Sequence, residues 1–227
     1  MTPDPILKVC GITRLEDALH ALQQGATALG FVFWPTSPRA ISPEAAREII
    51  AALPNGVTPV GVFVNESAEQ VREVVSASGI KAVQLHGDEA PEDFAFLECP
   101  LLRSVTLDRL DETSRGWPPE TTWLLDASDH VRRGGTGMPI DWDRASVVAR
   151  HHTVVLAGGL TPSNVEQAIR MVQPFGVDVS WGRGEARQSG PTRSEAQPSE
   201  PDQVDDHLKR AVLFDAAGTL IEPREPI

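Results

Sequence analysis

The chain has 227 residues, of which 41% are hydrophobic and 23% are charged, a composition typical of a folded globular protein. Its formal net charge at pH 7 is -12 and it has no Lys/Arg cluster, which argues against a nucleic-acid partner or an anionic membrane surface. We find neither a signal peptide nor a long apolar span, and Cys10 and Cys99 lie in unrelated sequence contexts, so we expect free thiols and a cytoplasmic protein.

The first apolar run, residues 6–10, is typical of a β-strand. In a strand the side chains alternate between two faces, so Lys8 and Cys10 would share one face and the apolar residues between them the other. A charged side chain and a thiol on one inward face are unusual in a purely structural core. This strand is therefore the first candidate for a functional position.

Apolar runs then alternate with helical patterns along the chain. The further strands are expected at 28–33, 59–64, 82–85, 101–107, 122–126, 154–156 and 176–180, and the helices at 14–24, 43–53, 67–78, 91–98, 141–151 and 161–172, with 108–119 the weakest unit. This alternation predicts a closed parallel (β/α)8 TIM barrel with right-handed crossovers. The rival fold is an open doubly wound sheet, but the first turn lacks a Gly-x-Gly-x-x-Gly phosphate loop and polar residues end many strands instead of one pair.

Polar residues stand at the carboxyl ends of several predicted strands, namely Cys10, Gln84, His86, Asp126, Asp178 and Ser180. Because the carboxyl ends of barrel strands open to one mouth, we expect these side chains to form a site there. Each residue alone has a simpler explanation, since a strand cysteine is usually a small buried hydrophobe and His86 before Gly87 would suit a turn. Cys99, next to Pro100 at the opposite end of a strand, is assigned no function.

The loop after the seventh strand holds Gly158 and Gly159 just before a predicted helix. Amide groups without side chains in the way, together with a helix N-terminus, are how barrels bind a phosphate after strands seven and eight. A second set of amides should follow Ser180. The substrate is therefore expected to be a phosphorylated small molecule.

Residues 6–180 resemble, in order, the phosphoribosylanthranilate isomerases of tryptophan biosynthesis. The matching segments are KVCGI at 8–12, GFVF at 30–33, SPR at 37–39, QLHG at 84–87, LLD at 124–126, GGTG at 134–137, LAGGL at 156–160 and GVDVS at 176–180. The resemblance implies an isomerase that converts N-(5'-phosphoribosyl)anthranilate into 1-(2-carboxyphenylamino)-1-deoxyribulose 5-phosphate by an Amadori rearrangement. It implies no metal and no cofactor. We expect a monomer or a homodimer.

By the same resemblance, Asp126 is the general acid and Cys10 the general base. Such roles need a protonated carboxyl and an ionised thiol, and we hypothesise that Lys8 lowers the pKa of the thiol. The resemblance also implies that Arg39 pairs with the anthranilate carboxylate and that residues 134–137 close over the site. The other implied contacts are Gln84, His86 and Asp178 for the ribose or the amine, and Gly158, Gly159, Ser180 and Gly182 for the phosphate.

The resemblance stops after Ser180, where Trp181 takes the place of an expected serine. We divide the chain into a barrel over 1–182, a polar and disordered linker over 183–206 and an atypical tail over 207–227, so the eighth helix is altered or missing. The tail is either sequence from outside the family, after a shift of frame or gene boundary, or a substitute helix over 202–214. Its segment 211–220 resembles the first motif of haloacid-dehalogenase-type phosphohydrolases, but too few residues follow for that domain.

Two other functions stay open beside the isomerase. The altered C-terminus allows a catalytically impaired barrel that only binds the phosphorylated ligand. An indole-glycerol-phosphate synthase is a weaker fit, because that neighbouring family relies on lysine and glutamate instead of a cysteine in the first strand.

Overall fold

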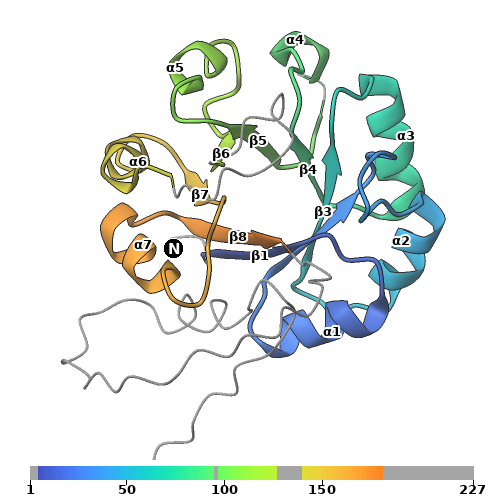
Figure 1. Cartoon of the computed structure of the whole chain (residues 1–227). Coiled ribbons are helices and arrows are strands. Elements are labelled where there is room, and N and C mark those ends of the chain that lie inside the picture. The colour runs from blue at the N-terminus through green and yellow to red at the C-terminus, as the bar shows by residue number, and fades with distance from the viewer. Residues whose placement is uncertain (1–4, 95–96, 127–139, 181–227) are drawn as a thin grey trace, which may run out of the picture.

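Parallel strands close into a barrel in this computed structural model, which describes residues 5–94, 97–126 and 140–180. The strands run in chain order from β1 to β8, and β8 pairs with β1 to complete the ring, with the helices outside it (Figure 1). The predicted (β/α)8 barrel is thus confirmed. The segment in which we expect the eighth helix to be altered or missing, the linker and the tail lie outside the described residues, as does the 134–137 loop.

The strands are β1 (Ile6–Cys10), β2 (Ala28–Val32), β3 (Thr58–Phe63), β4 (Ala82–Leu85), β5 (Leu101–Val105), β6 (Thr122–Leu125), β7 (Val154–Leu156) and β8 (Gly176–Ser180). The helices are α1 (Leu15–Gln23), α2 (Pro43–Ala51), α3 (Ala68–Ser78), α4 (Pro91–Phe94), α5 (Leu110–Thr113), α6 (Trp142–Ala149) and α7 (Val165–Val172). Among the residues described, no helix is long and apolar enough to cross a bilayer.

The helix boundaries follow from local side-chain chemistry. The Ser42 and Ser67 hydroxyls accept hydrogen bonds from the first-turn amides of α2 and α3, and the Asp141 carboxylate does the same for α6. Gly79 ends α3 with a φ of +83°, a left-handed conformation that glycine adopts without a steric penalty.

Helix α7 begins later than the sequence predicts, at Val165 and not at Thr161. The Asn164 side chain closes the preceding loop, because its Oδ1 accepts from the Thr161 amide at 2.8 Å and its Nδ2 donates to the Gly159 carbonyl at 2.9 Å. These side-chain bonds hold the backbone of residues 161–164 in a loop conformation instead of a further helical turn. The expectation for residues 161–164 was therefore wrong.

The strands separate two apolar layers, one inside the barrel and one outside it. The inner layer fills the barrel and includes Ile6, Ala28, Val60, Ala82 and Leu102, while the outer layer lies between the strands and the helices. Leu7 and Val9 belong to the outer layer, which leaves Lys8 and Cys10 on the inward face of β1 as predicted. A charged group thus sits where a packed barrel usually has branched aliphatic side chains.

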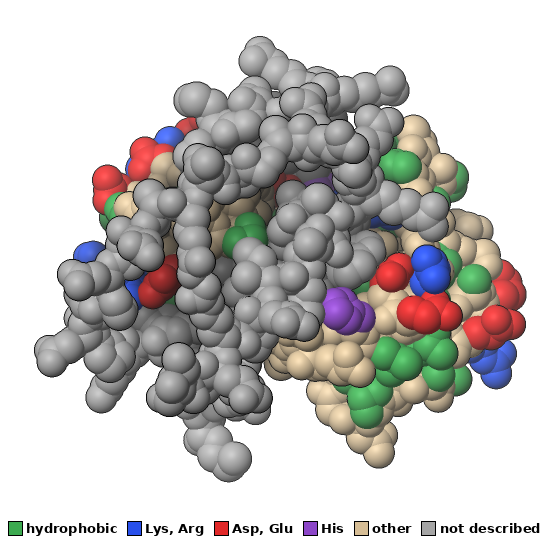
Figure 2. Space-filling view, turned by 60° about the horizontal axis from the view of Figure 1, so that its bottom comes forward, with side chains coloured by type: hydrophobic (Ala, Val, Ile, Leu, Met, Phe, Trp, Pro, Cys, Tyr) green, Lys and Arg blue, Asp and Glu red, His purple; other side chains and the backbone are tan. Residues whose placement is uncertain are grey.

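Charges of both signs are interspersed on the face shown in Figure 2, among the described residues. Several exposed arginines have acidic partners, as in the pairs Arg109–Asp88, Arg144–Asp108 and Arg170–Glu166. Exposed pairs of this kind add little to stability, typically below about 1 kcal/mol each. Their effect is to neutralise the positive side chains locally.

Candidate active site

Cys10 is the last residue of β1, and its thiol is buried at the carboxyl end of the barrel. The residue beside it in the β1–β2 register is Gly30. A Cβ at position 30 would lie 2.9 Å from the Cys10 Sγ, closer than real Cβ contacts come, and a tight 3.0 Å from its Cα. Gly30 therefore makes the room that the thiol occupies, a role that sequence reasoning missed.

Lys8 forms a buried ion pair with Asp178 across the seam where the barrel closes. The two residues are partners in the β1–β8 register, and the Lys8 Nζ lies 2.9 Å from the Asp178 Oδ2. Both side chains are almost fully shielded from solvent. The other carboxylate oxygen of Asp178, Oδ1, is buried and has no hydrogen-bond partner within the described part of the chain, which leaves it available to a ligand.

The charges around Cys10 oppose one another. Burial raises the pKa of the Cys10 thiol above its ordinary value, the Lys8 ammonium and the Arg39 guanidinium counteract part of that rise, and the Asp178 carboxylate adds to it. Burial would lower the pKa of Lys8, but Asp178 and Cys10 raise it overall, so Lys8 remains a cation. The predicted effect of Lys8 on the thiol has the expected sign, although burial outweighs it.

Asp126 follows β6 directly, and its amide donates to the Val105 carbonyl at 3.1 Å, which continues the pairing of β5 and β6 by one residue. Its side chain is half-buried at the same end of the barrel as Cys10. Burial raises the pKa of Asp178, Lys8 offsets part of this rise, and repulsion from Asp126 adds to it. The charge of Asp126 therefore raises the pKa of the Asp178 carboxyl, which is paired with Lys8 near the Cys10 thiol.

Arg39 approaches from the loop after β2. A Cβ at Gly11 would lie 2.5 Å from the Arg39 Cδ, so the arginine stem passes close over the residue that follows Cys10. Gly11 also has a φ of +95°, which a residue with a side chain rarely adopts. The half-buried guanidinium is close enough to affect both Cys10 and Asp178.

Gln84, on β4, and His86, the first residue after that strand, face each other as predicted. The Gln84 Nε2 lies 2.9 Å from the His86 Nδ1. An amide nitrogen can only donate, so in this arrangement the Nδ1 accepts and the ring hydrogen belongs on Nε2. The Gln84 Oε1 is buried without a partner among the described residues, which makes it a second unsatisfied acceptor in the barrel interior.

The loop after β7 presents backbone amides, as the sequence predicts, but not over its whole length. Gly158 and Gly159 have φ values of +73° and +71°, and a Cβ at Gly159 would meet nothing within 4 Å. Within the described residues no protein group accepts from the amides of residues 158–160, whereas the Thr161 amide already donates to Asn164. Ser180 is exposed at the end of β8, and Gly182 lies outside the described residues.

The structure thus brings Cys10, Arg39, Gln84, His86, Asp126, Asp178 and the 158–159 loop to the same end of the barrel. The sequence alone did not predict that Lys8 and Asp178 are a pair. The pair could have been predicted from the closed barrel itself, because closure places β8 beside β1. Arg103 and Glu89, to which no role was assigned from the sequence, form a second buried ion pair near His86.

A family model for N-(5'-phosphoribosyl)anthranilate (PRA) isomerase matches residues 7–183. This chain belongs to that isomerase family. Isomerases of the same name from Rubrobacter xylanophilus and Pelobacter propionicus are 46% identical over 186 residues and 45% identical over 181 residues. The first alignment covers 79% of this chain and 90% of the relative, and the second covers 78% and 85%.

Solved isomerase structures have the same fold. One of them, a phosphoribosyl anthranilate isomerase in complex with reduced 1-(o-carboxyphenylamino)-1-deoxyribulose 5-phosphate, has a TM-score of 0.69 and 38% sequence identity. The alignment covers 96% of this chain and 100% of the solved chain. The resemblance inferred from the short motifs is confirmed, and the family match ends three residues after β8.

Proposed function

We propose that this chain converts N-(5'-phosphoribosyl)anthranilate into 1-(2-carboxyphenylamino)-1-deoxyribulose 5-phosphate in tryptophan biosynthesis, with Asp126 as general acid and Cys10 as general base. The observation that supports these roles best is that both groups stand at the carboxyl ends of strands in one closed barrel, β6 and β1. The proposed setting is the cytoplasm, with the chain a monomer or a homodimer.

The first step opens the ribose ring. Asp126 donates a proton to the furanose oxygen, the C1'–O bond breaks, and the nitrogen lone pair forms a C1'=N iminium. In this role Asp126 must hold a proton when the substrate is bound.

The second step moves a proton from carbon. The Cys10 thiolate removes the C2' proton, the electron pair forms the C1'=C2' bond, and the iminium becomes a neutral enolamine. Tautomerisation then returns a proton to C1' and leaves a ketone at C2'. The two steps together are an isomerisation with no net oxidation, so a single acid and a single base suffice.

The remaining groups suit the charges of this substrate. Arg39 would bind the anthranilate carboxylate, for which a planar bidentate donor is well shaped. The Asp178 Oδ1 and the Gln84 Oε1 would accept from ribose hydroxyls or the amine, and the His86 Nε2–H would donate. The amides of Gly158 and Gly159 would bind the phosphate, with Ser180 and Gly182 as further proposed contacts.

The competing proposal is a barrel that binds the ligand without turnover, motivated by the departure from the family pattern after Ser180. The deciding experiment follows the fluorescence of N-(5'-phosphoribosyl)anthranilate with the purified full chain, against a buffer control for spontaneous hydrolysis. We expect enzyme-dependent turnover. Binding of the reduced product analogue by calorimetry, without turnover, would establish the binding barrel instead.

A further inference from the structure

Arg103 is a charged residue in the layer where the other outward residues of β5 are apolar. It lies between Leu101 and Val105 on that strand, is only 3% exposed, and stacks against Trp117 with the guanidinium carbon 5.5 Å from the ring centre. Burying an arginine is costly unless its charge and its donors are satisfied. The contacts that satisfy its Nη1 and Nη2 donors are therefore informative, whereas its Nε is buried without a partner among the described residues.

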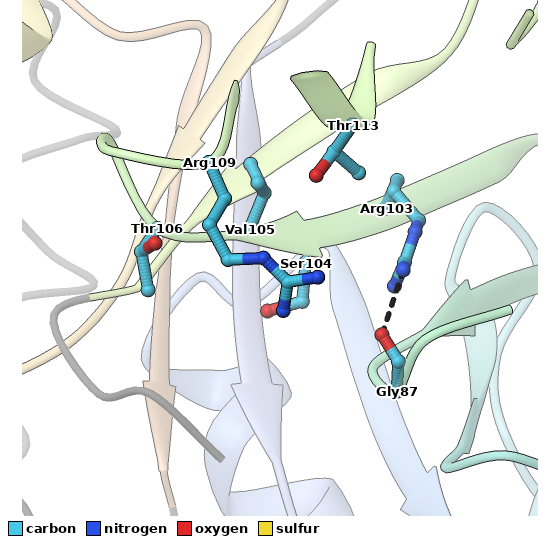
Figure 3. A pocket seen from close by; sticks show the side chains of 7 residues that line it. All are labelled: Gly87, Arg103, Ser104, Val105, Thr106, Arg109 and Thr113. Atoms are coloured by element: carbon cyan, nitrogen blue, oxygen red, sulfur yellow. Dashed lines mark hydrogen bonds between the residues drawn. The ribbon is translucent and has the colours of Figure 1, made fainter. Parts of the chain in front are cut away.

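Two of those contacts are backbone carbonyls on either side of His86. The Arg103 Nη1 donates to the Leu85 carbonyl at 3.1 Å, and the Nη2 donates to the Gly87 carbonyl at 2.7 Å. Figure 3 shows the guanidinium pointing at the Gly87 carbonyl beside a small pocket. One planar side chain thus holds the peptide groups before and after His86 in a fixed relation.

Glu89 completes the arrangement from the other side. Its Oε2 lies 3.1 Å from the Arg103 Nη1, and its carboxylate accepts from the Gly87 amide at 2.9 Å and the Asn65 amide at 2.8 Å. The Glu89 side chain is only 1% exposed. Gly87 is therefore bound at both its amide and its carbonyl.

The neighbouring loop after β3 is hydrogen-bonded to the loop that carries Gly87 and Glu89. The Asn65 Oδ1 accepts from the Asp88 amide at 2.6 Å, and Asn65 itself has a φ of +53°. A Cβ at Gly87 would collide with the Asn65 Oδ1, so only glycine fits after His86. A left-handed backbone at a residue other than glycine persists only where the surrounding contacts hold it in place.

We propose that Arg103 and Glu89 are positioning residues for the reaction, which act through His86 by fixing the backbone that carries it. This inference rests on the proposed function for its kinetic consequence. Gln84 holds the ring by its Nδ1, and the Arg103–Glu89 pair holds the main chain on both sides, so together they leave the His86 Nε2–H one direction in which to point. A displacement of about 1 Å at such a group lowers rates substantially.

The test is a double-mutant cycle in the full chain. Arg103→Gln removes the charge and the paired donation, and its kcat/KM is compared in the wild-type and His86→Ala backgrounds. We expect a loss of about tenfold or more in the first background and less than about twofold in the second. Equal losses in both backgrounds would overturn the proposal, because the arginine would then act independently of His86.

Arg109→Gln is the matched control, since it removes an arginine that pairs with Asp88 of the same loop without touching the His86 backbone. It should leave kcat/KM within about twofold of the wild type in both backgrounds. Should Arg103→Gln fail to fold, Glu89→Gln replaces it in the cycle with the same expectation, because it removes the counter-charge and keeps a side chain of nearly equal size.

A second readout does not depend on turnover. Nitrogen-15 NMR of labelled histidines, with His86 assigned from His86→Gln, reports the ring hydrogen bond and tautomer. We expect Arg103→Gln or Glu89→Gln to shift the His86 ring resonances and leave the other histidines unchanged, and Arg109→Gln to shift none. An unmoved His86 contradicts the positioning role, whereas an inactive wild type with a shifted His86 contradicts only the proposed function.

Discussion

The thiol of Cys10 depends on groups that have opposite effects on its ionisation. Burial favours the neutral thiol, while Lys8, two residues earlier on the same strand face, favours the thiolate. Lys8 is itself bound to Asp178, whose carboxylate favours the thiol. The reactivity of the proposed base is thus set by the balance within one buried triad of side chains.

Lys8→Met should raise the pKa of the Cys10 thiol, because the cation that stabilises the thiolate is lost. Asp178→Asn should lower it, because a carboxylate that opposes ionisation becomes a neutral amide. The rate of alkylation against pH measures both shifts, in a Cys99→Ala background where Cys10 is the remaining thiol. A midpoint unchanged in Lys8→Met would remove Lys8 from the account.

At the scale of elements, local chemistry explains what the sequence could predict. Helices α2 and α3 begin where, to within one residue, the predicted ranges 43–53 and 67–78 place them, after the caps Ser42 and Ser67, and α3 ends at Gly79, directly after its predicted range. The loop before α7 was mispredicted because Asn164 bonds within it, and such a bond depends on a loop path that a periodic pattern does not contain. The Arg103–Glu89 pair was missed for a similar reason, since its partners are brought together by neighbouring strands.

Ser67→Ala should lower the free energy of unfolding by about 1 kcal/mol, because the Gln70 amide loses its acceptor at the start of α3. Urea denaturation followed by circular dichroism measures the change. Ser76→Ala is the control, since Ser76 is exposed within the same helix, and it should be neutral or slightly stabilising. Equal effects of the two substitutions would show that the cap contributes nothing.

At the scale of the whole molecule, the barrel depends on the seam between β1 and β8. The alternation of strands and helices predicts a barrel, and the polar strand ends predict where its site lies. What the alternation does not contain is the register at the seam, which places Lys8 opposite Asp178 and Ile6 opposite Gly176. Closure therefore builds the electrostatics of the site as well as the fold.

Gly176→Ala should destabilise the whole barrel. A Cβ at this position would collide with the Ile6 carbonyl oxygen, which is backbone and cannot move without disturbing the seam. We expect a loss of about 2 kcal/mol or more in thermal or urea unfolding, within the range of overpacked sites. Gly56→Ala is the control, because a Cβ at Gly56 meets nothing within 4 Å. It should lower the free energy of unfolding only by the roughly 1–2 kcal/mol that a left-handed backbone costs a residue with a side chain. A Gly176→Ala variant no less stable than Gly56→Ala would mean that the seam tolerates a side chain.

The central claim is that a thiol on β1 and a carboxyl after β6 are the base and the acid of one isomerisation. The most direct measurement is kcat for Cys10→Ser and for Asp126→Asn in the full chain, with binding of the reduced product analogue as the control for an intact site. The account predicts that each substitution lowers kcat by at least about a hundredfold while the analogue still binds. A near-normal kcat in either variant would contradict it.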